Sequence, residues 1–351
     1  MLTPGIVGAI ARSDADPSPW NAADVHAIIR HDLAYPASVA IGDRRADDPV
    51  LAPLRRAATA KQVRSVTVAA TATLVSQILA DAGVPSLSYK GPALAVQSTG
   101  SFVGRGSTDV DVLIDADDCP RADAALRKAG CQSRVGYPAA PSRWERFHRP
   151  ERAYTGLPVT IDLHWRVDPG PGYFATPFAE LWGRRVTLDH DGLVVSTLDD
   201  VDALLVTAVH GAKERWWRWF WALDAIHQVE GLPSESWVEA ARRARAAGAR
   251  ASMAMCLAVV AECGGAVPDA ALSAGLAPSP RVRADARQWL AHASDAGQVE
   301  WSKRASWSRR RARWSMADSP LVAVDGFARA VGRLLADRRA PGAPQGSPPA
   351  R

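Results

Sequence analysis

Hydrophobic residues follow two different periods along the chain, and the change of period separates the predicted elements. From residue 54 to 82, apolar side chains recur at helical spacing, which predicts one long helix that Gly83 and Pro85 end. Between about 85 and 165 the apolar runs are short and are broken by glycine and proline, as in strands. The predicted strands lie at 86–90, 110–114, 131–135, 152–154 and 159–165, and short helices are predicted over 92–97 and 119–129.

The helical period returns after about residue 196. The helices predicted there cover 198–212, 215–229, 234–247 and 251–263, with two shorter ones over 268–274 and 281–293. The expected fold class is therefore α+β: a small mixed β-sheet with helices, followed by an all-helical domain. The expected segments are an irregular head over 1–53, the α+β core over 54–195, the helical domain over 196–335 and a disordered, proline-rich tail over 336–351.

Composition places the chain among globular proteins and argues against several other classes. Apolar residues make up 47% and charged residues 23%, which is enough for a buried core. The four cysteines form no CxxC pair, which argues against a disulfide framework or a zinc site. No secretory signal is visible, and no apolar run approaches the roughly 18 residues that cross a bilayer. We therefore expect a cytoplasmic protein without a membrane span.

Two aspartates stand inside the apolar run DVDVLID, which otherwise reads as a buried strand. Residues two apart in a strand share a face, so Asp109 and Asp111 should point the same way. Carboxylates this close repel each other unless a cation neutralises them, and paired aspartates suit Mg²⁺. Without metal, Asp111→Asn should therefore relieve repulsion and leave the protein folded or more stable. Asp162, in the alternating strand VTIDLHWRV, would join the pair if the two strands ran antiparallel, giving the carboxylates of a two-metal site.

The residues around the first pair of aspartates suit the phosphates of a nucleotide. Gly91 lets backbone N–H groups approach an anion at the start of the helix predicted over 92–97. Lys90 and Arg105 can neutralise phosphate charge, and Ser107 and Thr108 add hydroxyl groups directly before the first aspartate. We expect these five residues to bind the nucleotide.

Candidates for the acceptor site are His164, on the same strand face as Asp162, and His210 and Lys213, which lie one helical turn apart. The tryptophans within 216–221 fit packing in a core or domain interface better than stacking on a ligand. The stretch 301–314 mixes tryptophan with basic residues and gives weak support for nucleic acid or a membrane surface, against a solvated helix packed on the body.

The motifs YKGPALA, then an arginine four residues before DVDVLID, then IDLHWRV, occur in this order. They resemble a family of uncharacterised bacterial nucleotidyltransferases in the DNA polymerase β-like superfamily. The helical half, with VHGAKERWWRWFWALDAIHQV, is similar to the same family, and the resemblance covers roughly residues 60–265. The chain departs from the family pattern at three places. Tyr89 stands where leucine is usual, and Phe102 is the only aromatic residue in the region where a tyrosine is usual. Gly91-Pro92 replaces the Gly-Gly or Gly-Ser pair of other superfamily members.

The resemblance implies a nucleotidyltransferase with Asp109, Asp111 and Asp162 as catalytic and metal-binding residues. Such an enzyme moves a nucleoside monophosphate from an NTP to a hydroxyl or phosphate acceptor and releases pyrophosphate, with two Mg²⁺ ions, or Mn²⁺ in their place. Two alternatives remain open from sequence: an RNA-directed or toxin-like transferase, and a non-catalytic binding or accessory protein that keeps the fold. The acceptor is not identified by any motif.

Overall fold

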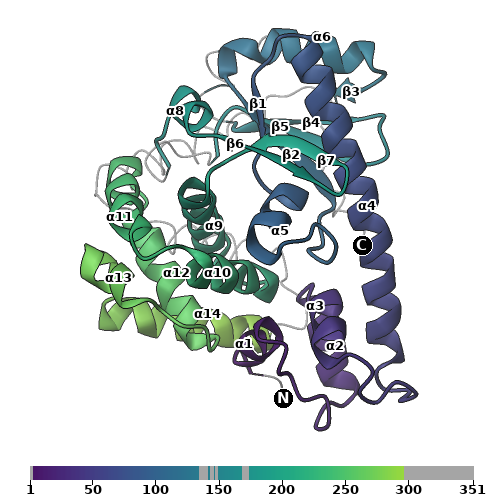
Figure 1. Ribbon diagram of the computed structural model, residues 1–351, viewed down its shortest axis with the longest axis vertical. Helices are drawn as coiled ribbons and strands as arrows, with labels where there is room; N and C mark the ends of the chain where they lie inside the picture. Colours follow the sequence, from purple (N-terminus) through teal and green to yellow (C-terminus); the bar gives the residue numbers. More distant parts are fainter. Residues whose placement is uncertain (1–2, 134–140, 143–145, 147–148, 168–173, 296–351) are drawn as a thin grey trace, which may run out of the picture.

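The computed structural model describes residues 3–133, 141–142, 146, 149–167 and 174–295. It has an α+β core with a five-stranded mixed sheet and a large helical half (Figure 1), which confirms the fold class. The strand order is β1-β2-β5-β4-β3. The strands are β1 (Ser86–Ser88), β2 (Asp109–Ile114), β3 (Gln132–Ser133), β4 (Glu151–Thr155) and β5 (Thr160–His164).

The two central strands, β2 and β5, run parallel. The sequence analysis assumed an antiparallel pair, and that assumption is wrong because α6 (Cys119–Lys128) and the β3–β4 hairpin carry the chain across before β5 begins. The other pairings in this sheet, β1–β2, β3–β4 and β4–β5, are antiparallel.

Each face of the five-stranded sheet packs on a different set of helices. One face meets the long helix α4 (Ala52–Asp81) and α6, in a core that includes Val75, Val110 and Ile161. The opposite face, which carries Leu113, packs toward α5 (Gly91–Thr99) and the helical half. Figure 1 shows α4 along one edge of the molecule and α5 between the sheet and the helical half.

The helical half agrees closely with its predicted elements. Its helices are α9 (Asp200–Glu214), α10 (Trp219–Gly231), α11 (Ser236–Ala247), α12 (Arg250–Glu262), α13 (Asp269–Ala271), a π-helical turn (Leu272–Leu276) and α14 (Pro280–Asp295). The side chain of Asp199 caps α9 by accepting a hydrogen bond from the Asp202 amide at 2.8 Å. Trp216 and Trp219 are buried, as expected for packing residues.

The N-terminal head is helical and not irregular. It contains α1 (Ile6–Ala11), α2 (Ala22–Arg30) and α3 (Ala34–Ile41). Asp32, which has a φ of 63°, accepts from Lys61 of α4 at 2.6 Å and also from Arg218 at the start of α10. The head therefore shares the Asp32–Arg218 ion pair and one hydrophobic core with the helical half.

Between the core and the helical half, the sequence analysis missed α8 (Phe178–Gly183) and the hairpin of β6 (Val186–His190) and β7 (Leu193–Thr197). The hairpin had a strong signal, since Asp191-Gly192 occupies the two-residue turn with both φ angles positive.

Two further predictions can be compared with the described residues only in part. All four cysteines are free and buried. One described helix, α4, is long and apolar enough to cross a bilayer, although core helices of soluble proteins meet the same criterion and this is weak evidence for a span. The predicted tail over 336–351 and the basic stretch 301–314 lie outside the described residues.

Candidate active site

The two central strands bring the predicted aspartates together. In the parallel register, Asp111 lies opposite Asp162, and Asp109 lies opposite Thr160. Because residues two apart share a face, Asp109, Asp111, Asp162 and His164 all point toward the helical half. The carboxylate oxygens of Asp111 and Asp162 and a ring nitrogen of His164 lie within 4.8 Å of one another.

Asp111 is neutralised by two side chains of the protein. Lys90, from the turn between β1 and α5, donates to Asp111 Oδ1 at 3.0 Å, and His164 Nε2 lies 2.9 Å from the same oxygen. Burial by itself would raise the pKa of Asp111, but Lys90 and His164 outweigh burial and hold it well below its usual range. The same pairing raises the pKa of Lys90 against the opposing effect of burial. The contact with Lys90 reverses the expected effect of Asp111→Asn on the metal-free protein: the change would leave a largely buried ammonium group without its partner, so we now expect a loss of stability.

Asp162 and Asp109 have no such partner. Within the described ranges, neither carboxylate lies within ion-pair distance of a lysine or an arginine. Burial, with Asp111 and Glu151 nearby, raises the pKa of Asp162 to about 7. Burial and the charge of Asp111 also raise the pKa of Asp109. On this side of the site the carboxylates are therefore costly to ionise in the absence of a bound cation.

Glu151, at the start of β4, is a site residue that the sequence analysis missed. It lies opposite His164 in the β4–β5 register, and its Oε2 is 3.1 Å from His164 Nδ1. The Tyr89 ring meets His164 edge-on at 5.3 Å between centroids. Glu151 is found only from the observed register, in which Tyr154 pairs with Ile161, because a register shifted by one residue would place Pro150 opposite His164.

The nucleotide-binding candidates gather around the start of α5. Gly91 has a φ of +53°, and a Cβ there would lie 3.1 Å from Ser107 Oγ, so glycine suits both the backbone and the space. Ser107 Oγ donates to the Asp109 carbonyl at 2.9 Å, which ties this turn to β2. Arg64 of α4 donates to the carbonyl groups of Ser107 and Thr108 at 3.2 and 2.9 Å and fixes them from outside.

Arg105 is placed differently from the simple phosphate ligand that the sequence analysis expected. Its Nε donates to Asp224 Oδ2 of α10 at 2.8 Å, and its Nη1 donates to the Gly91 carbonyl at 3.4 Å. Both side chains of the pair are nearly buried. Arg105 therefore lies beside the Lys90-Gly91 turn, but its charge is already matched by Asp224.

His210 and Lys213 of α9 lie on the helical side of the site. His210 is close enough for its pKa to be lowered, first by burial and then by the charges of Lys213 and Lys90. Its ring meets Trp221 edge-on at 4.9 Å, and Trp221 meets Trp217 at 5.8 Å. Lys213 Nζ lies 3.5 Å from Glu214. Half-buried aromatic rings thus stand beside the imidazole that faces the aspartates.

Carboxylates on two adjacent central strands, with a Lys-Gly turn opening a helix beside them, define a core of the nucleotidyltransferase type. The model of an uncharacterised nucleotidyltransferase family matches residues 20–265 of the chain. The chain belongs to this family, and the match includes most of the N-terminal head as well as the core. Among curated proteins, none matches the chain.

Proposed function

We propose that the protein transfers a nucleoside monophosphate from an NTP to a hydroxyl or phosphate acceptor, with release of pyrophosphate. The observation that carries this proposal is the pairing of Asp111 and Asp162 across β2 and β5, beside Lys90 at the start of α5. An acceptor oxygen attacks the α-phosphorus, the bond between the α-phosphorus and the bridging oxygen breaks, and pyrophosphate leaves with that oxygen.

The side chains of the candidate site are suited to bind divalent metal ions. Three carboxylates on one face supply the hard oxygen ligands that Mg²⁺ prefers, and burial together with neighbouring carboxylates raises the pKa values of Asp109 and Asp162. Asp109, Asp111 and Asp162 would hold two Mg²⁺ ions, with Mn²⁺ as a substitute. When bound, such ions neutralise phosphate charge and lower the barrier to in-line displacement.

The remaining steps fall to side chains and backbone groups. Asp162 would help to take up the proton of the acceptor hydroxyl while it ligates the metal. Lys90 supplies a permanent positive charge for the triphosphate, and the N–H groups at the start of α5 supply donors. Ser107 and Thr108 hold the turn in place. His210, Lys213 and the rings of Trp217 and Trp221 are placed to shape the acceptor site.

A non-catalytic accessory role is the second candidate, and one observation favours it. Lys90, Asp111 and His164 form a chain of contacts that satisfies Asp111 without metal. A protein that had kept the fold only as a binding module would retain such a chain. The RNA-directed alternative rests on 301–314, outside the described residues.

Label transfer distinguishes these candidates. Purified protein is incubated with each of four NTPs labelled at the α-phosphate, MgCl₂ and fractionated cell extract. We expect label to move to one fraction with wild-type protein, and to be lost with EDTA or with Asp162→Asn. Label found on RNA would favour the RNA-directed enzyme. Absence of transfer from every NTP, together with unchanged melting on addition of Mg²⁺ and NTP, would favour the accessory role.

A further inference from the structure

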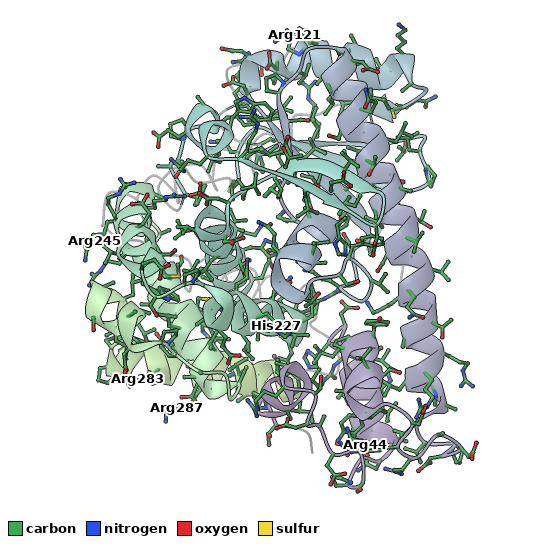
Figure 2. The ribbon with its side chains drawn as sticks, in the orientation of Figure 1. Arg44, Arg121, His227, Arg245, Arg283 and Arg287 are labelled. Atoms are coloured by element: carbon green, nitrogen blue, oxygen red, sulfur yellow. The ribbon has the colours of Figure 1, made fainter. Side chains whose placement is uncertain are left out.

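A cavity of about 310 Å³ is lined by Arg105 and Asp224 and by no residue of β2 or β5. Its walls come from α1, α3, the loop after α5 and α10, so the N-terminal head and the helical half both contribute to it. Figure 2 shows His227 of α10 on the side of the helical half that faces the N-terminal helices. The volume is at the small end of ligand pockets, which suits one small ring system better than a large acceptor.

The floor of this cavity presents a hydrogen-bond donor next to an acceptor. Arg105 uses Nε for Asp224 and Nη1 for the Gly91 carbonyl. In the described part of the chain, Arg105 Nη2 and Asp224 Oδ1 form no hydrogen bond, and neither is among the fully buried unpaired atoms. One group can donate to a ligand while its neighbour accepts from the same ligand.

The walls are aromatic and aliphatic. Tyr35 of α3 and Phe220 of α10 both line the cavity, together with Val39 and Leu223. Tyr35 reaches this position because residue 104 is glycine: a Cβ at Gly104 would lie 2.0 Å from the Tyr35 ring, and the φ of +116° also favours glycine. The loop after α5 is thus shaped to admit the Tyr35 ring.

His227 adds a third polar group. It lines the cavity one turn after Asp224, and no hydrogen bond joins its ring nitrogens to other residues in the described part of the chain. Burial lowers its pKa, so the ring is neutral at physiological pH and offers one donor and one acceptor.

We propose that this cavity receives the nucleobase of the incoming NTP, an inference that rests on the proposed nucleotidyl transfer. A nucleobase is planar, has two apolar faces and carries adjacent donors and acceptors on its edge, which matches the rings of the walls and the Arg105–Asp224 floor. The contact of Arg105 with the Gly91 carbonyl places this floor beside the turn that would hold the triphosphate. Arg105 would then read the base, while Lys90 meets the phosphates.

The test compares binding of NTPs with binding of inorganic tripolyphosphate, which lacks a base. Val39→Trp fills the cavity from a rim position that is 56% exposed. Val63→Trp is the matched control, because Val63 is 65% exposed on α4 and does not line the cavity. Titration calorimetry with MgCl₂ measures all four NTPs and tripolyphosphate on each protein, and thermal melting verifies that both variants fold.

We expect wild-type protein and Val63→Trp to bind at least one NTP about tenfold more tightly than tripolyphosphate. Val39→Trp should lose most of that difference and keep the affinity for tripolyphosphate. If Val39→Trp lowers the melting temperature, Val39→Phe repeats the comparison with a smaller side chain. Equal NTP affinity in all folded variants would overturn the base pocket and leave nucleotidyl transfer standing. Absence of binding of both NTPs and tripolyphosphate to wild-type protein would overturn the proposed function as well.

Discussion

Asp111 and Asp162 stand opposite each other on paired strands, yet their surroundings are opposite in charge. Asp111 meets Lys90 and His164, and its pKa is held far below its usual range, whereas burial beside other carboxylates raises the pKa of Asp162 to about 7. Strand pairing gives both residues the same height and face. The difference arises from the β1–α5 turn, which brings Lys90 to one strand only.

This contrast divides the site into a balanced half and an unbalanced half. The balanced half, Lys90, Asp111 and His164, is satisfied by the protein itself. The unbalanced half, Asp109 and Asp162, stays costly to ionise until a cation arrives. A site of this kind is assembled in advance on one side and is completed by metal on the other.

The largest expected effect comes from Asp111→Asn. Breaking the buried pair with Lys90 should lower the free energy of unfolding by about 3–5 kcal/mol. Nucleotidyl transfer should fall by at least about 10²-fold, since a ligand for the metals is lost as well. Chemical denaturation in EDTA measures the first effect, and label transfer measures the second.

Lys90→Met tests whether that loss comes from the ion pair itself. It removes the ammonium group and should destabilise the protein too, since it leaves Asp111 with His164 alone. If Asp111→Asn and wild type have the same free energy of unfolding in EDTA, the Lys90–Asp111 pair does not stabilise the protein and the balanced half is disproved.

The next largest effect has the opposite sign. Asp162→Asn should stabilise the metal-free protein, by about 1–3 kcal/mol at pH 8, because it removes a carboxylate that is costly to ionise in the folded state. The raised pKa means that the folded protein holds this proton more tightly than the unfolded chain does. The stability linked to it is complete below about pH 4, the ordinary pKa of aspartate, and is lost as the pH rises to about 7.

The advantage of Asp162→Asn over wild type should therefore grow between pH 5 and pH 8 in EDTA. Thermal melting across this range measures it, and adding Mg²⁺ should favour wild type alone. An advantage that is independent of pH would show that the effect has another cause than the ionisation of Asp162.

The amino-acid sequence was sufficient to predict the carboxylates of the site, but not the side chains and strand direction that distinguish their surroundings. Alternation places Asp109 and Asp111 on one face of their strand in DVDVLID, and Asp162 and His164 on one face of theirs in VTIDLHWRV. The register observed between β2 and β5 is what brings the two pairs to the same face of the sheet. The predicted direction of the β2–β5 pairing was wrong, because this direction depends on how α6 and the β3–β4 connection cross the sheet. The Arg105–Asp224 pair joins residues 119 positions apart, and no local pattern predicts such a partner. Without that partner, Arg105 looked like a free phosphate ligand.

A substitution of Glu151 tests where the balanced half of the site ends, and its effect on the free energy of unfolding should be the smallest of those predicted. Its carboxylate lies 3.1 Å from His164 Nδ1, but its side chain is 46% exposed, so water screens the interaction. Asp111 Oδ1 lies 2.9 Å from Nε2 of the same ring, so Glu151 shares this imidazole with a second carboxylate. Glu151→Gln should therefore change the free energy of unfolding by no more than about 1 kcal/mol.

Chemical denaturation of Glu151→Gln checks this value, with Glu180→Gln as a matched control, since Glu180 is an exposed partner of Arg184 on α8, outside the candidate site. Similar small losses of unfolding free energy in both variants would show that Glu151 lies at the rim of the candidate site and outside the balanced half. A loss in Glu151→Gln as large as that of Asp111→Asn would instead extend the balanced half through His164 to β4. The orientation of the His164 ring would then depend on two carboxylates, and Asp109 and Asp162 would remain the aspartates on the paired strands that a metal ion has to balance.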